Sequence, residues 1–203
     1  MSRNKTSRRQ RLGVRGLPNK SSVRIFEWRR VNRQILNSVF SKRHAMSKAE
    51  RREIIGYLSE LKKIWEGLPG RYLLAHSTLA VAVGRYFDLL GWDVGFELPF
   101  ADFDSSYRFD VVAQKTGRTV VVEVKPEVST KALGQVLGYV FDVEKKLKRA
   151  RVLLATDIAN FPAIMSGGEI TGIIVDNAER HGLGVMFADK KDAWLIPAEF
   201  LSV

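Results

Sequence analysis

The stretch "RFDVVAQKTGRTVVVEVK", residues 108–125, sets two valine-rich segments on either side of a Thr-Gly pair. Alternating side chains are typical of strands, and a two-residue loop ending in glycine predicts a tight hairpin. If Thr116–Gly117 forms the loop, Asp110 lies opposite Glu123, and Lys125 shares their face two residues further along. A register slip of one residue would mix apolar and polar faces, so the hydrophobic pattern favours this pairing.

The paired carboxylates of this hairpin need a chemical explanation. Directly opposed residues have Cβ atoms about 4.5–5.5 Å apart, and like charges at that distance repel unless a cation or a proton lies between them. Carboxylate oxygens are the ligands that hard divalent cations prefer. Asp110 and Glu123 are therefore candidate ligands of one such cation, with Lys125 offsetting charge and orienting a water. The alternative is a solvent-facing strand on which Glu123 and Lys125 balance each other.

The segments around the hairpin predict a mixed α/β fold. An almost wholly apolar segment reads as a helix buried against a sheet, and shorter runs bounded by turn residues read as strands. The resulting core has the order α-β-β-β-α-β. We expect helices at 73–90 and 129–150, strands at 92–100, 108–115, 118–125 and 151–157, and three further strands at 172–176, 184–188 and 193–197, the last two forming a hairpin.

The first 50 residues carry the excess positive charge of the chain. They hold 14 lysines and arginines against two acidic residues, whereas the remainder holds 19 basic and 20 acidic residues. Residues 1–20 have no periodicity and should be disordered in isolation. Residues 21–68 predict a basic helical appendage of two helices, the second opened by a capping box at Ser47–Glu50. Residues 69–203 are expected to form the α/β domain.

Charge concentrated at one end is typical of a protein that binds a polyanion. Nucleic acid is the favoured partner, while a solubilising or targeting tail and an anionic membrane surface stay open as alternatives. The apolar stripes of the two helices are expected to pack on each other, on the α/β domain or on a second subunit. The arginines expected to contact nucleic acid are Arg8, Arg9, Arg11, Arg29, Arg30 and Arg33.

The cysteine content and the apolar runs of the sequence restrict the possible metal centres and the cellular location of the protein. The chain has no cysteine, which excludes disulfides, thiolate zinc sites and iron–sulfur clusters. The N-terminus has no apolar signal core, and the longest apolar run, 73–83, is far shorter than a membrane span. We therefore expect a cytoplasmic, intracellular protein without a membrane segment.

The segments "FD" at 109–110 and "EVK" at 123–125 resemble the split motif of the PD-(D/E)XK nuclease superfamily, which includes restriction endonucleases, archaeal Holliday junction resolvases and RecB-like nucleases. "QVLGY" at 135–139 is similar to the Q-x-x-x-Y helix motif of the RecB-like branch. The resemblance covers roughly residues 72–156 and implies a restriction-endonuclease-like αβββαβ core. Two departures are that Phe109 replaces the family's proline and that the helix before the sheet offers only Asp88 as an acid.

The resemblance implies roles for individual residues. Asp110, Glu123 and the carbonyl of Val124 would hold Mg²⁺, or Mn²⁺ in its place, and Lys125 would orient a water and stabilise charge on the phosphate. Gln135 and Tyr139, one helical turn apart, would reach a phosphate or position the lysine. The additional ligand that the family's first helix often supplies would come from His76 or from Glu97.

The expected function is metal-dependent hydrolysis of DNA phosphodiester bonds, with an endonuclease favoured over an exonuclease. RNA stays open as a substrate. So does a homodimer, since cutting two strands often uses two active sites. Two alternatives belong to other classes: a catalytically inactive nucleic-acid-binding protein on a nuclease-like core, and an oligomeric architectural protein assembled through its paired apolar helices.

Overall fold

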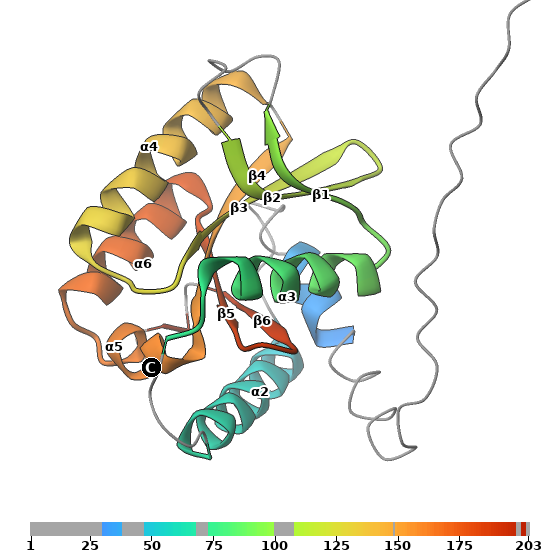
Figure 1. The fold of residues 1–203 in the computed structure, drawn as a ribbon. Helices are drawn as coiled ribbons and strands as arrows, with labels where there is room; N and C mark the ends of the chain where they lie inside the picture. The colour runs from blue at the N-terminus through green and yellow to red at the C-terminus, as the bar shows by residue number, and fades with distance from the viewer. Residues whose placement is uncertain are drawn as a thin grey trace, which may run out of the picture.

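The computed structural model describes residues 30–37, 47–67, 73–99, 108–147, 149–197 and 200–201 (Figure 1). Its centre is one six-stranded mixed sheet in which the strands stand side by side in the order of the chain. The β3–β4 and β4–β5 pairs are parallel and the other pairs are antiparallel. The strands are β1 (Asp93–Pro99), β2 (Arg108–Lys115), β3 (Arg118–Lys125), β4 (Ala150–Asp157), β5 (Gly184–Ala188) and β6 (Ala193–Ile196).

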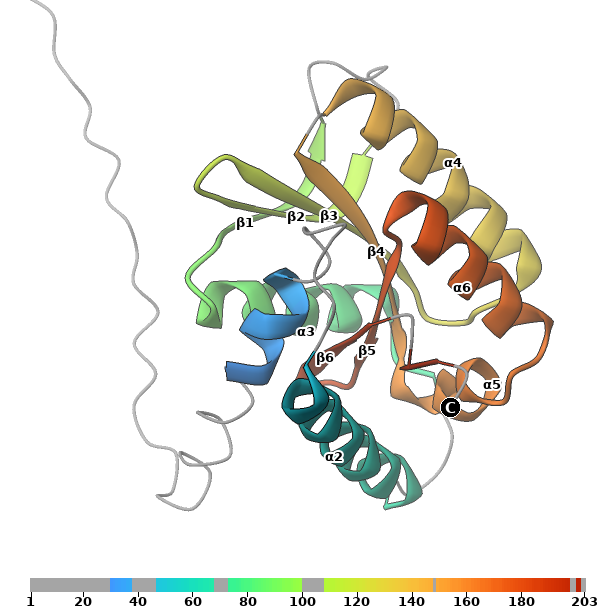
Figure 2. The same ribbon diagram turned by 180° about the vertical axis from the view of Figure 1, so that it is seen from behind.

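Helices cover both faces of this sheet. Helix α3 packs on one face, chiefly against β1 and β2, while α4 and α6 lie side by side on the other (Figures 1 and 2). The predicted α-β-β-β-α-β order is confirmed by the run from α3 to β4. The helices are α2 (Lys48–Glu66), α3 (His76–Leu89), α4 (Thr130–Lys146), α5 (Phe161–Met165) and α6 (Glu169–His181), with a 3₁₀ turn at Ile158–Asn160 and a helical segment at 30–37.

The β2–β3 hairpin has the predicted register. Its pairs run from Lys115↔Arg118 at the turn to Val111↔Val122. Thr116 and Gly117 have φ of 46° and 74°, as a tight turn matched to the strand twist requires. Both faces of the hairpin are buried in valine-rich packing because helices lie on both sides of the sheet.

The prediction of a strand at 172–176 is wrong, because these residues lie inside helix α6. Ile170, Ile173 and Ile174 recur at helical spacing, and a short apolar run alone does not separate a buried strand from a helix. Gly182, with φ of 71°, ends the helix in the left-handed conformation. The helix expected to reach residue 150 also stops earlier, since α4 ends at Lys146 and β4 begins at Ala150.

The two N-terminal helical segments pack on the sheet domain. Ile35 and Leu61 are fully buried in the same core as the sheet, so their apolar stripes serve packing. The predicted capping box is present, with Ser47 and Glu50 each bonding the other's backbone N–H. The expected disordered tail at 1–20 lies outside the described residues.

Helix length gives little indication of a membrane span. In the described part of the chain no single helix is long and apolar enough to cross a bilayer. One pair bent by 88°, Ile158–Met165 with Glu169–His181, passes the same test by length and composition only.

Candidate active site

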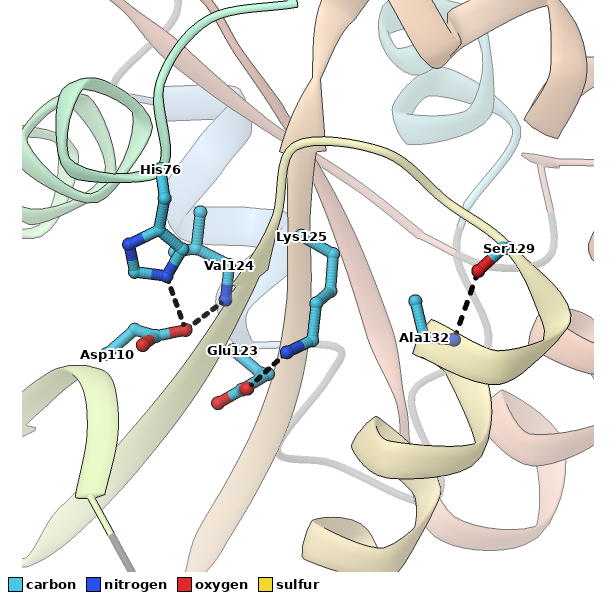
Figure 3. Close-up of polar contacts among 7 residues, drawn as sticks. All are labelled: His76, Asp110, Glu123, Val124, Lys125, Ser129 and Ala132. Atoms are coloured by element: carbon cyan, nitrogen blue, oxygen red, sulfur yellow. Dashed lines mark hydrogen bonds and ion pairs between the residues drawn. The ribbon is translucent and has the colours of Figure 1, made fainter.

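The candidate site lies where β2 begins and β3 ends, beside the start of α3 (Figure 3). Asp110 stands one residue beyond the last pair of the β2–β3 ladder. Its Oδ2 atom accepts a hydrogen bond of 2.7 Å from the backbone N–H of Val124. The same oxygen lies 3.1 Å from Nε2 of His76, the first residue of α3. The carboxylate is thus fixed between one strand and one helix.

Glu123 is the buried carboxylate of the pair, with its side chain 6% exposed. Lys125 Nζ donates to its Oε1 over 2.8 Å. Its Oε2 is buried and has no hydrogen-bond partner among the described residues. Burial raises the pKa of Glu123, and the nearby Asp110 raises it further, while the hydrogen bond from Lys125 works in the opposite direction. The site therefore holds an acceptor oxygen that no described residue satisfies.

Tyr139 reaches the site from α4. Its ring packs edge-on against Phe109, the neighbour of Asp110, with centroids 5.6 Å apart. Burial raises the pKa of the Tyr139 hydroxyl, and the charges of Glu123 and Asp110 raise it further. The hydroxyl therefore stays protonated at neutral pH.

Gln135 lies one turn earlier on the same helix. Its side chain is exposed and makes no hydrogen bond among the described residues. The start of α4 is fixed by Ser129, whose Oγ accepts from the N–H of Ala132 over 3.2 Å (Figure 3). Tyr139 thus lies near the carboxylates, and Gln135 is exposed one turn before it on the same face of the helix.

Asp157, at the end of β4, was not predicted as part of this region. It is 3% exposed, and its Oδ2 accepts from the N–H of Leu74 over 2.8 Å. Its Oδ1 accepts from the N–H of Ala159, also at 2.8 Å, which caps the 3₁₀ turn. This carboxylate ties the segment leading into α3, and so His76, to the sheet. A sequence signal existed, since an aspartate ending a buried strand demands a partner.

Glu97, the other candidate for the additional ligand, is placed differently. It lies in β1 with φ of 48°, and its side chain is exposed. No hydrogen bond or ion pair joins it to Asp110 or Glu123 in the described part of the chain. Of the two candidates, His76 is the one that contacts the pair.

The oxygen atoms of the site are of the type that hard cations bind. Two carboxylates and the Val124 carbonyl offer oxygen ligands, and no donor among the described residues reaches Oε2 of Glu123. Within the residues described, however, no three His, Asp or Glu side chains are grouped to hold a metal. In this arrangement Lys125 and His76 occupy the positions next to the two carboxylates.

Of the six arginines predicted to bind nucleic acid, two lie among the described residues. Arg30 forms an ion pair with Glu53 of α2, and Arg33 is exposed on the same helical segment. Arg8, Arg9, Arg11 and Arg29 lie outside the described residues.

The sequence matches no protein-family model and no curated protein. Two solved structures are similar in shape: a XisH family protein from Nostoc punctiforme PCC 73102 and a FdxN element excision controlling factor protein from Anabaena variabilis. Each is 18% identical with a TM-score of 0.44 over 55% of this chain, covering 91% and 90% of the respective neighbour. The residues of the site itself therefore carry the functional proposal.

Proposed function

We propose that this protein is a divalent-metal-dependent nuclease that hydrolyses DNA phosphodiester bonds, with endonucleolytic action. The observation that carries the proposal is that Asp110 lies near Glu123, beside Lys125, and that the buried Oε2 of Glu123 has no hydrogen-bond partner among the described residues. Two carboxylates close together, one of them buried, destabilise the fold, so their presence at the end of the hairpin favours a functional role. The sequence resemblance to PD-(D/E)XK nucleases supports the same chemistry.

The proposed ligands of the metal are Asp110, Glu123 and the Val124 carbonyl, with Mg²⁺ as the expected ion and Mn²⁺ as a substitute. A divalent cation held by these residues would supply polarisation of the scissile phosphate and a water of lowered pKa. His76 holds the Asp110 carboxylate in place through the 3.1 Å contact.

Lys125 and Tyr139 are proposed to act on the substrate. The Lys125 ammonium, now donating to Glu123, would turn toward the phosphate and stabilise the charge that develops on it. The Tyr139 hydroxyl, which its surroundings keep protonated, would donate to a phosphate oxygen. The basic N-terminal region would contact the backbone of DNA and supply affinity with little sequence preference.

The test compares the wild type with Asp110→Asn and Glu123→Gln on supercoiled, linear and four-way-branched DNA. Each substrate is incubated with Mg²⁺, with Mn²⁺ or with EDTA. We expect cleavage with metal, no cleavage in EDTA, and a loss of at least about 100-fold in either variant. Asp176→Asn, an exposed carboxylate on α6 (69% exposed), is the matched control and should cleave like the wild type.

A second candidate function is a nucleic-acid-binding protein without catalysis. The observation that favours it is that the described residues do not group three ligating side chains around a metal position. It predicts salt-sensitive DNA binding that is identical in the wild type and Asp110→Asn and unaffected by EDTA. If no metal or substrate supports cleavage and both proteins bind DNA equally, the nuclease proposal is wrong.

A further inference from the structure

A row of three cations crosses the sheet at the turn end of the hairpin, at the opposite end from the carboxylates. Lys115 and Arg118 are directly opposed across β2 and β3. Arg149 comes next, because the N–H of Thr119 bonds its carbonyl and Thr119 pairs with Ala150. Neighbouring strands are about 4.8 Å apart, so the three residues stand in one line. We call Lys115, Arg118 and Arg149 the basic row.

The side chains of the basic row are held at the surface. All three residues are exposed. Lys115 Nζ donates to the carbonyl of Leu90 at the end of α3 over 2.7 Å, and Arg149 Nη1 reaches to within 3.8 Å of where a Cβ on Gly117 would stand. Like charges directly opposed across strands destabilise a sheet. A row of this kind is therefore better explained by an anionic partner than by folding.

The basic row continues onto the N-terminal helical segment. Arg118 Nη1 donates to Oδ1 of Asn37 over 3.2 Å. Arg33, exposed one helical turn before Asn37, lies on the same side of that segment. Lys145 and Lys146, exposed in the last turn of α4, come shortly before Arg149 in the chain. Three separate elements thus bring basic residues toward one end of the sheet.

We infer that the basic row binds the phosphate backbone of a nucleic-acid duplex. Phosphates follow one another at about 3.4 Å per strand along the axis of a duplex, so a line of cations can meet several of them. The binding surface stands on its own residues and does not depend on the proposed nuclease function.

A lipid surface fits the basic row less well than a nucleic acid. Interfacial binding to a membrane uses apolar side chains next to the basic ones, which enter the acyl region. The turn that presents the row offers only Thr116 and Gly117. A row of cations at strand spacing is suited to the regular charges of a phosphate backbone.

The test measures duplex DNA binding by fluorescence anisotropy in EDTA, where cleavage does not occur. Arg118→Gln/Arg149→Gln is compared with Arg52→Gln/Lys62→Gln, which removes the same charge from exposed positions of α2, away from the hairpin turn (Figure 1). Lys115 is left in place because it also binds the end of α3. We expect about tenfold weaker binding and a salt slope smaller by about two in the first variant, and wild-type values in the second.

A charge-conserving variant, Arg118→Lys/Arg149→Lys, separates charge from folding and should keep the wild-type salt slope. Equal binding by the wild type and by Arg118→Gln/Arg149→Gln, which we call the Gln pair, would overturn the inference. So would a Gln pair that loses binding only to phosphatidylserine-containing vesicles, which would assign the row to a membrane. An equal loss of affinity in the control variant Arg52→Gln/Lys62→Gln would also overturn the inference, because the loss would then reflect net charge and not the basic row.

Discussion

The backbone N–H of Leu74 donates to Oδ2 of Asp157 over 2.8 Å, although 83 residues separate them in the chain. This bond fixes the approach to α3 against the end of β4. Because His76 follows two residues later and contacts Asp110, the placement of the candidate site depends on a carboxylate that does not touch it.

Asp157→Asn should therefore destabilise the protein. An asparagine has one acceptor oxygen, so one of the two backbone N–H groups that Asp157 now satisfies would lose its partner. We expect a loss of about 1–3 kcal/mol in the free energy of unfolding, measured by urea denaturation. Asp176→Asn on α6 should change it by less than about 0.5 kcal/mol. Equal stability of the two variants would contradict this role.

Glu123→Gln should stabilise the fold at neutral pH while abolishing cleavage. Since the pKa of Glu123 is raised in the folded protein, the native state binds a proton more tightly than the unfolded chain does. The wild type therefore loses stability as pH rises from its ordinary pKa of 4.5 to the raised value.

The difference between Glu123→Gln and the wild type should appear across that pH range and vanish below it, where both side chains are neutral. Urea denaturation at a series of pH values measures it. A wild type that gains stability over the Gln variant as pH rises would show that the carboxylate is stabilised rather than strained.

Two substitutions of Tyr139 should separate its ring from its hydroxyl. Tyr139→Phe keeps the packing on Phe109 and should leave stability within about 0.5 kcal/mol, while cleavage falls by roughly tenfold for lack of the donor. Tyr139→Ala should also cost about 1–2 kcal/mol through lost aromatic packing. Thermal unfolding and initial cleavage rates measure the two effects. Unchanged cleavage by Tyr139→Phe would remove the hydroxyl from the mechanism.

Thr116→Asn should raise stability. Thr116 has φ of 46°, which a β-branched residue adopts at a cost, whereas Asn-Gly is the favoured pair for this turn. We expect a gain of about 1 kcal/mol in urea denaturation. Gly117→Ala, at φ of 74°, should have the opposite sign. A loss of stability in Thr116→Asn would mean that the threonine makes a compensating interaction.

Local pattern was sufficient for the hairpin and for the pairing at its end. Valines at period two, a Thr-Gly loop and the mixing of faces in any other register predicted the pairing from Lys115↔Arg118 to Val111↔Val122, beyond which Asp110 and Glu123 follow. Periodicity also predicted α2 with its capping box, and an almost wholly apolar run predicted the buried α3. These features depend on residues close together in the chain.

Features that depend on distant segments were not predictable in this way. The run at 172–176 fits either a strand or a helix, and its packing against α4 decides for the helix. The link from Asp157 to Leu74 joins segments 83 residues apart. The choice between His76 and Glu97 likewise depended on how α3 and β1 meet the hairpin.

The six strands lie in the sheet in the same order as in the chain. Each strand emerging during synthesis therefore finds its partner already present, and no strand has to be inserted between two others. The β2–β3 hairpin, whose loop closes over two residues, can form before β4 has been made. Assembly from the N-terminal side would build the carboxylate pair early and leave its restraint by Asp157 to a later step. The newly made chain would then carry its two acids before the contact that orders their surroundings.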